Sequence, residues 1–126
     1  MSVDNASTSN GANVLQETWN GGENQQWKIE DTSPGYYKFI AQHSGKVLDV
    51  SGASTSDGGN VHQWEWLGAS NQEWSIIYVG DGFYKLLAKH SGKALDIDGA
   101  STQNGANIQQ WVDNGTCAQK WQLIGI

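Results

Sequence analysis

One set of side chains has the chemistry needed to bind a polyhydroxylated ligand such as a sugar. The Asp49 carboxylate can accept hydrogen bonds from two neighbouring hydroxyls, and such charge-assisted bonds are strong. Trp64 offers a flat, rigid surface for the apolar C–H face of a sugar ring. Asn71 and Gln72 both donate and accept hydrogen bonds, as hydroxyls do. His62 lies two residues before Trp64, on the same side of a predicted strand, and is expected to add a contact.

A similar set follows 47 residues later in the chain. Asp96 repeats the carboxylate, and Trp111 repeats the aromatic ring. The residues of this second predicted site are Asp96, Gln109, Trp111, Asn114 and Gln119. Ala118 stands where the first set has Asn71, so the second set has fewer polar groups. Either aspartate could instead cap a turn, so a structural role stays open for both.

The first part of the chain keeps little of this set. Ser2 stands at the position of the aspartate, and Glu17 stands at the position of the tryptophan. Only Asn24 and Gln25 match the amides. We therefore expect this part of the chain to bind nothing or to bind weakly.

Another tryptophan recurs in all three parts, including the one that has lost the aspartate. Trp27, Trp74 and Trp121 are separated by 47 residues, and each ends a Gln-x-Trp sequence. Recurrence without the carboxylate predicts a role in the core. The glutamine of this motif recurs equally, so part of its role is expected to be internal hydrogen bonding.

The same spacing divides the whole chain, which has the length of a single domain, 1–126. Repeat one covers residues 1–35, repeat two 36–82 and repeat three 83–126. The His-Ser-Gly-Lys sequence that opens repeats two and three has no counterpart in repeat one. Repeat one is therefore predicted to lack its first strand.

Each full repeat is predicted to contain four strands, because apolar residues alternate at period two and helical spacing is sustained nowhere. In repeat three these strands are Phe83–Ala88, Ala94–Ile97, Asn107–Trp111 and Lys120–Ile124. Three repeats are too few for a propeller, and a solenoid would leave two ends to be capped. A closed barrel removes edges. The sequence therefore favours an all-β barrel with pseudo-threefold symmetry.

Composition and charge exclude several functions. The net charge is −6 and the chain has no Arg, so nucleic acid and anionic membranes are poor partners. Cys117 is the single cysteine and therefore cannot form an intrachain disulfide. No apolar run is long enough to cross a membrane. The N-terminal sequence shows no signal peptide. Asp49 and Asp96 are repeat equivalents on different sides of a threefold fold, so they cannot act as a hydrolytic pair. We expect no catalysis, no cofactor and no metal.

With its three Gln-x-Trp sequences, and with Leu-Asp-Val and Leu-Asp-Ile strands in the last two repeats, the chain resembles the ricin B-type β-trefoil lectins. That family includes carbohydrate-binding modules attached to glycoside hydrolases. The resemblance covers essentially the whole chain. It implies a β-trefoil, a six-stranded barrel with three hairpins capping one end.

The resemblance also implies a non-catalytic lectin or carbohydrate-binding module, multivalent through repeats two and three. Galactose or N-acetylgalactosamine glycans are the first expected ligands, and xylan or another plant polysaccharide is the alternative. A protein-binding β-trefoil, such as an inhibitor or a cytoskeletal binder, is a further alternative. The missing strand could come from a longer protein or from a second copy in a homo-oligomer, or the barrel could tolerate the gap. As part of a longer protein the domain would act outside the cell or at its surface.

Overall fold

A computed structural model describes residues 1–125 of the chain. The strands are β1 Ser2–Val3, β2 Val14–Gln16, β3 Trp27–Ser33, β4 Tyr36–Ala41, β5 Val47–Val50, β6 Val61–Trp64, β7 Trp74–Gly80, β8 Phe83–Ala88, β9 Ala94–Ile97 and β10 Ala106–Trp111. Six single-turn 3-10 helices lie between them: η1 Asp4–Ala6, η2 Glu23–Gln25, η3 Ser51–Ala53, η4 Ser70–Gln72, η5 Asp98–Ala100 and η6 Cys117–Gln119. No helix within the described residues is long and apolar enough to cross a membrane.

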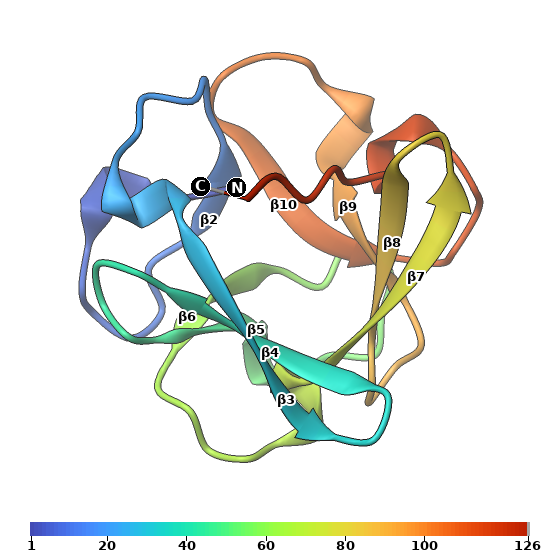
Figure 1. Cartoon of the computed structure of the whole chain (residues 1–126), viewed down its shortest axis with the longest axis horizontal. Coiled ribbons are helices and arrows are strands. Elements are labelled where there is room, and N and C mark those ends of the chain that lie inside the picture. The colour runs from blue at the N-terminus through green and yellow to red at the C-terminus, as the bar shows by residue number, and fades with distance from the viewer. Residues whose placement is uncertain (126) are drawn as a thin grey trace.

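All pairing between the strands is antiparallel, and two long hairpins stand out in Figure 1. Strands β3 and β4 form one hairpin, and β7 and β8 form the other. The strands follow the order β1-β2-β10-β9-β8-β7-β4-β5-β6, and a bridge between Asn13 and His62 brings β6 back to the start of the sheet. The predicted all-β class is confirmed, and the ring of strands is nearly closed.

The two hairpins occupy equivalent positions: β3–β4 connects repeat one to repeat two, and β7–β8 connects repeat two to repeat three. The pair Tyr37 and Trp74 joins β4 to β7, and the pair Tyr84 and Trp121 makes the same contact 47 residues later. The strand predicted at Lys120–Ile124 is wrong, because only Trp121 makes a bridge there. Its counterparts β3 and β7 each pair with the next strand of a hairpin, and no described residue provides that partner here.

One asparagine from each repeat meets the other two in a ring of amides. Asn13 donates to Asn107 Oδ1 at 2.8 Å, Asn60 donates to Asn13 Oδ1 at 2.9 Å, and Asn107 donates to Asn60 Oδ1 at 2.8 Å. Each side chain therefore donates once and accepts once around the ring. The ring shows that the repeat seen in the sequence is a threefold arrangement in space.

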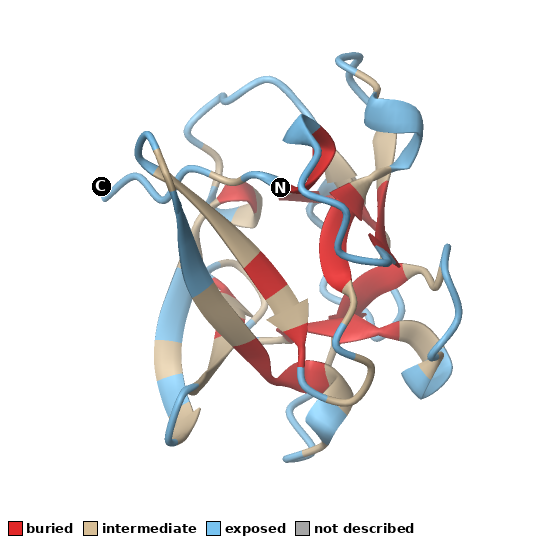
Figure 2. Ribbon diagram, turned by 90° about the vertical axis from the view of Figure 1, so that its right-hand side faces the viewer, coloured by how far each residue is buried: buried red, intermediate tan, exposed pale blue. Residues whose placement is uncertain are grey.

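The core lies inside the ring of strands, as the buried segments in Figure 2 show. Trp74 is completely buried in this core. Trp27 and Trp121 pack against it but stay partly exposed. Met1 takes the position of Leu48 and Leu95, since its carbonyl accepts a 3.1 Å hydrogen bond from Trp27 Nε1. Burial lowers the pKa of the Met1 ammonium below its usual value.

Candidate functional site

The predicted site of repeat two is built on two paired strands. Asp49 on β5 lies directly opposite His62 on β6, and Trp64 follows on the same strand. Only 4% of Asp49 is exposed, and its carboxylate is held by three side chains. His62 Nε2 lies 2.8 Å from Asp49 Oδ1. Gln72 donates to Asp49 Oδ2 at 2.9 Å, and Asn71 donates to the same oxygen at 3.4 Å.

The aromatic wall of this site consists of two stacked rings. The His62 and Trp64 rings lie 5.6 Å apart between centroids, with an interplanar angle of 25°. Both side chains thus lie on the same side of β6, as their spacing predicts. Gly11 of repeat one lies against Trp64: a Cβ at this glycine would come within 3.7 Å of the ring. Repeat one therefore forms one border of the site in repeat two.

The two amides of repeat two have different roles. Gln72 is completely buried, accepts from the Leu67 N–H at 2.8 Å and donates to the Glu65 carbonyl at 2.8 Å. This side chain closes the loop before η4 and orients Asp49. Asn71 also donates to the Val50 carbonyl at 3.0 Å and is only partly buried. Of the two, Asn71 is the one with room to contact a ligand.

Repeat three reproduces this frame with different side chains. Gln109 donates to Asp96 Oδ1 at 3.1 Å, and Gln119 donates to Asp96 Oδ2 at 3.0 Å. Gln119 also binds its own loop, where it accepts from the Asn114 N–H and donates to the Val112 carbonyl. Asp96 is 6% exposed. A glutamine thus takes the place of His62, and the carboxylate keeps two donors.

A shallow pocket of about 420 Å³ opens beside Asp96. The predicted residues Gln109, Trp111 and Asn114 line it, and Trp111 is 38% exposed. Gln119 does not line this pocket. The side-chain oxygen of Asn114 accepts from the Thr116 hydroxyl at 2.8 Å, which leaves the Asn114 amide nitrogen for other partners.

Sequence reasoning missed four residues that border the two candidate sites, Asp98, Thr116, Gly58 and Gly11. Asp98 in η5 and Thr116 line the pocket of repeat three. Gly58 of repeat two lies against Trp111, as Gly11 lies against Trp64. The glycines recur in the sequence at the repeat spacing, and this was the one available signal for them.

Repeat one has no equivalent site. Ser2 replaces the aspartate and accepts from Asn24 at 3.2 Å, while Asn24 also donates to the Val3 carbonyl at 2.9 Å. Gln25 closes its loop through Thr18 and Asn20, as the other two glutamines close theirs. Repeat one therefore keeps the loop and lacks both the carboxylate and the aromatic ring.

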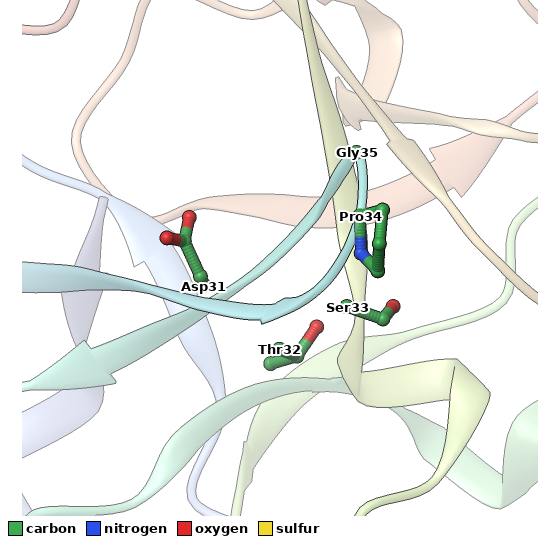
Figure 3. Close-up of a pocket in the computed structure, with 5 residues that line it drawn as sticks. All are labelled: Asp31, Thr32, Ser33, Pro34 and Gly35. Atoms are coloured by element: carbon green, nitrogen blue, oxygen red, sulfur yellow. The ribbon is translucent and has the colours of Figure 1, made fainter.

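A second hollow, of about 430 Å³, lies at the turn of the β3–β4 hairpin. Five consecutive residues line it, Asp31 to Gly35, and Figure 3 shows the Asp31 carboxylate pointing away from Pro34. The hollow lies against a single turn, and no aromatic ring is among the residues that line it, although the buried Thr32 and Ser33 hydroxyls there have no hydrogen-bond partner among the described residues. We do not place a binding site there. Within residues 1–125, no group of three His, Cys, Asp or Glu side chains could hold a metal ion.

Comparison with protein families matches residues 1–64 and 68–125 to the ricin-type beta-trefoil lectin domain-like family. The chain belongs to this family. Membership supports a carbohydrate-binding role and confirms the β-trefoil fold. Comparison with curated protein sequences gives no match.

Three solved structures illustrate the likeness. The designed threefold-symmetric protein ThreeFoil is 54% identical, with a TM-score of 0.98, over 99% of this chain and 89% of that one. An exo-beta-1,3-galactanase from Clostridium thermocellum, 1,3Gal43A, is 40% identical, with a TM-score of 0.97, over 99% of this chain and 27% of that one. The Macrolepiota procera ricin B-like lectin, solved with lactose, is 20% identical, with a TM-score of 0.77, over 87% and 77%, and shows the fold alone.

Proposed function

We propose that this chain is a non-catalytic carbohydrate-binding module that binds galactose-type glycans through repeats two and three. The observation that carries this proposal is the repeated frame of Asp49 with Trp64 and of Asp96 with Trp111. In each frame a nearly buried carboxylate is fixed by amide or imidazole donors next to a partly exposed indole. Repeat one lacks both groups together.

The carboxylates have capacity left for a ligand. Each carboxylate oxygen can accept about two hydrogen bonds. Among residues 1–125, His62 is the one partner of Asp49 Oδ1, and Gln109 is the one donor to Asp96 Oδ1. The remaining lone pairs can accept from two adjacent sugar hydroxyls while the indole covers the C–H face.

Shallow sites of this kind bind weakly one at a time. Two sites on one rigid domain gain avidity when the glycan presents several copies of the sugar. Repeats two and three are joined through β7, β8 and the ring of asparagines, so the spacing between their sites is fixed. We therefore expect stronger binding to polysaccharides and glycan-coated surfaces than to single sugars.

Galactose is favoured because one of the similar proteins is a galactanase, and it is 40% identical over nearly the whole of this chain. N-acetylgalactosamine differs from galactose at one substituent and is the related ligand to compare.

Calorimetry with galactose, lactose and xylan oligomers tests this proposal on the full chain. Trp64→Ala should remove one binding site and Trp111→Ala the other, so that the double variant binds no sugar. Trp19→Ala is the matched control, because Trp19 is an exposed indole in the repeat without a carboxylate. Unchanged lactose binding by the double variant would overturn the assignment.

A second candidate is a module that directs a glycoside hydrolase to xylan or another plant polysaccharide. The galactanase supports only the attachment to an enzyme, because this chain matches 27% of that longer protein. Preferential binding of xylan oligomers over lactose in the same titrations would select this alternative. A protein-binding β-trefoil has no need for a carboxylate and an indole in each of two repeats, so this alternative is less well supported.

A further inference from the structure

The chain contains four Asn-Gly sequences, and the structure gives them different surroundings. Asn-Gly is the dipeptide at which an asparagine side chain reacts most readily with its own backbone, because glycine has no side chain to obstruct the ring that forms. All four asparagines are exposed, so access to water does not distinguish them. One of them, Asn114, lines the pocket of repeat three. The four sequences are Asn10-Gly11, Asn20-Gly21, Asn104-Gly105 and Asn114-Gly115.

The reaction at such a sequence needs a free backbone nitrogen and a polarised side-chain carbonyl. The glycine nitrogen gives up its proton to water and attacks Cγ of the asparagine. A C–N bond forms, the bond from Cγ to Nδ2 breaks, and Nδ2 takes up a proton and leaves as ammonia, so that a five-membered succinimide remains. Water then opens the ring at either carbonyl carbon, which yields aspartate or isoaspartate. Both products carry one more negative charge than the asparagine.

Two of the four glycine nitrogens are held by hydrogen bonds. The Gly11 and Gly105 N–H groups each donate to a backbone carbonyl of another repeat at 2.8 Å. Within residues 1–125, no acceptor is hydrogen-bonded to the N–H of Gly21 or of Gly115. A nitrogen that is held in this way must first break its hydrogen bond, so Gly21 and Gly115 provide the better nucleophiles.

The side-chain oxygen of Asn114 has two donors. The Thr116 N–H donates to Asn114 Oδ1 at 3.1 Å, and the Thr116 hydroxyl donates to it at 2.8 Å. Asn20 Oδ1 accepts from one donor among the described residues, the Gly22 N–H at 2.8 Å. Negative charge develops on this oxygen when Cγ is attacked, and donors aimed at the oxygen stabilise that charge. Asn114 therefore combines a free nucleophile with two donors.

Asn104 is the matched comparison within the same chain. Its Oδ1 also accepts from the N–H and the hydroxyl of a threonine, Thr18, at 2.7 and 3.1 Å. Asn104 and Asn114 thus have the same pair of donors, and they differ in whether the N–H of the following glycine is held. Asn10 has a held glycine and one donor among the described residues, the Glu65 N–H.

We propose that Asn114 is a site of spontaneous deamidation and that its deamidation inactivates the sugar site of repeat three, a consequence that rests on the proposed function. The new carboxylate stands in the pocket that Asp96 and Asp98 also line. It removes the N–H donors of the amide and adds a like charge. In isoaspartate the backbone also gains one carbon atom, within the loop that Gln119 closes by accepting from the Asn114 N–H at 3.0 Å.

The modification affects one of the two candidate sites. Repeat two has Leu67 at the position of Asn114, so its loop cannot react in this way. Deamidation therefore converts a chain with two sites into a chain with one. The avidity for a glycan that presents several copies of the sugar falls with the age of the protein, while the affinity of repeat two for a single sugar stays the same.

Incubation of the full chain in mildly alkaline buffer, with peptide mass spectrometry at intervals, tests the modification. Trypsin cleaves after Lys93 and Lys120, so one peptide carries Asn104 and Asn114, and its fragments report both rates. Asn114 should deamidate about tenfold faster than Asn104, because its nucleophile has no hydrogen bond to break. In urea, where the fold is lost, the two rates should become similar. Thr116→Val should slow Asn114 severalfold and leave Asn104 unchanged.

Calorimetry with lactose tests the consequence for binding. Anion exchange separates the deamidated chain from the fresh one, and Trp64→Ala in both leaves repeat three as the site that is measured. Deamidation should weaken this site about tenfold, since it removes donors and adds a like charge. Asn114→Asp should weaken it similarly. Asn20→Asp is the matched control with unchanged binding, because Asn20 lies in the repeat without a carboxylate and an indole.

Two results would overturn the proposal. One is an equal rate at Asn104 and Asn114 in the folded chain, or an Asn114 that stays intact while Asn20 reacts. The other is a deamidated chain that binds lactose as tightly as the fresh chain. A fresh chain that binds no sugar would refute the proposed function, whereas the mass spectrometry measures the modification in either case. The two proposals can therefore fail separately.

Discussion

The sites of repeats two and three share one frame and differ in the groups that fill it. Both hold a nearly buried aspartate near the end of a short strand, with a loop glutamine that donates to Oδ2. Repeat two adds His62 and Asn71, whereas repeat three has Gln109 and Ala118 at those positions. The two repeats therefore share the aspartate and the glutamine that holds it, and the neighbouring positions are free to set the affinity for a ligand.

The largest effect on sugar affinity among these predictions is expected from substitution of the two aspartates. Asp49→Ala should weaken sugar binding at repeat two by about 3 kcal/mol, roughly 100-fold, because it removes charge-assisted acceptors. Asp96→Ala should do the same at repeat three. Calorimetry measures both losses, and Ser2→Ala in repeat one serves as the control with unchanged binding. Equal binding by the chain and by the Asp49→Ala, Asp96→Ala double variant would mean that neither frame is the site.

The same substitutions should also reduce stability. Asp49→Ala leaves His62 Nε2 and Gln72 Nε2 without their buried acceptor, and a buried unpaired donor costs about 1–3 kcal/mol. Urea unfolding followed by tryptophan fluorescence measures the decrease in the free energy of unfolding. If the variant were as stable as the original chain, the carboxylate would make no contribution to the free energy of unfolding.

A smaller effect is expected at the position that distinguishes the two amide sets. Asn71→Ala should weaken repeat two by about 1 kcal/mol, roughly fivefold, by removing one hydrogen-bonding group. Ala118→Asn should strengthen repeat three by a similar factor, since Ala118 lines the open pocket there. In calorimetry, Asn71→Ala should be combined with Trp111→Ala, and Ala118→Asn with Trp64→Ala, so that the other site is silent and one site is measured at a time. A loss of affinity from Ala118→Asn would contradict the comparison.

The repeat spacing was enough to predict much of this molecule. It gave the threefold arrangement and the strands Phe83–Ala88 and Ala94–Ile97, because alternation and turn residues act locally. The prediction at Lys120–Ile124 was wrong, because a strand needs a partner and the local pattern does not report one. Its counterparts β3 and β7 form strands by pairing with the segments that follow them, β4 and β8, and no described residue provides such a partner for residues 120–124.

The candidate site was predictable in its members and not in their burial. Sequence alone treats Asp49 as a ligand-facing acceptor, whereas it is nearly buried and organises three side chains. Gln72 is likewise completely buried, so it positions the aspartate more than it meets a ligand. The burial of these two side chains depends on how the loop before η4 folds back over β5. Residue types at fixed spacing do not determine the path of that loop.

The ring of Asn13, Asn60 and Asn107 has a consequence for the accuracy of folding. Its three hydrogen bonds run in one direction, so turning a single amide around would disrupt two of them. A shift of one residue in any of the three segments would carry its asparagine away from the other two, and the side chains of that segment to the opposite face of the sheet. All three hydrogen bonds of the ring can therefore form only when all three repeats are in the correct register.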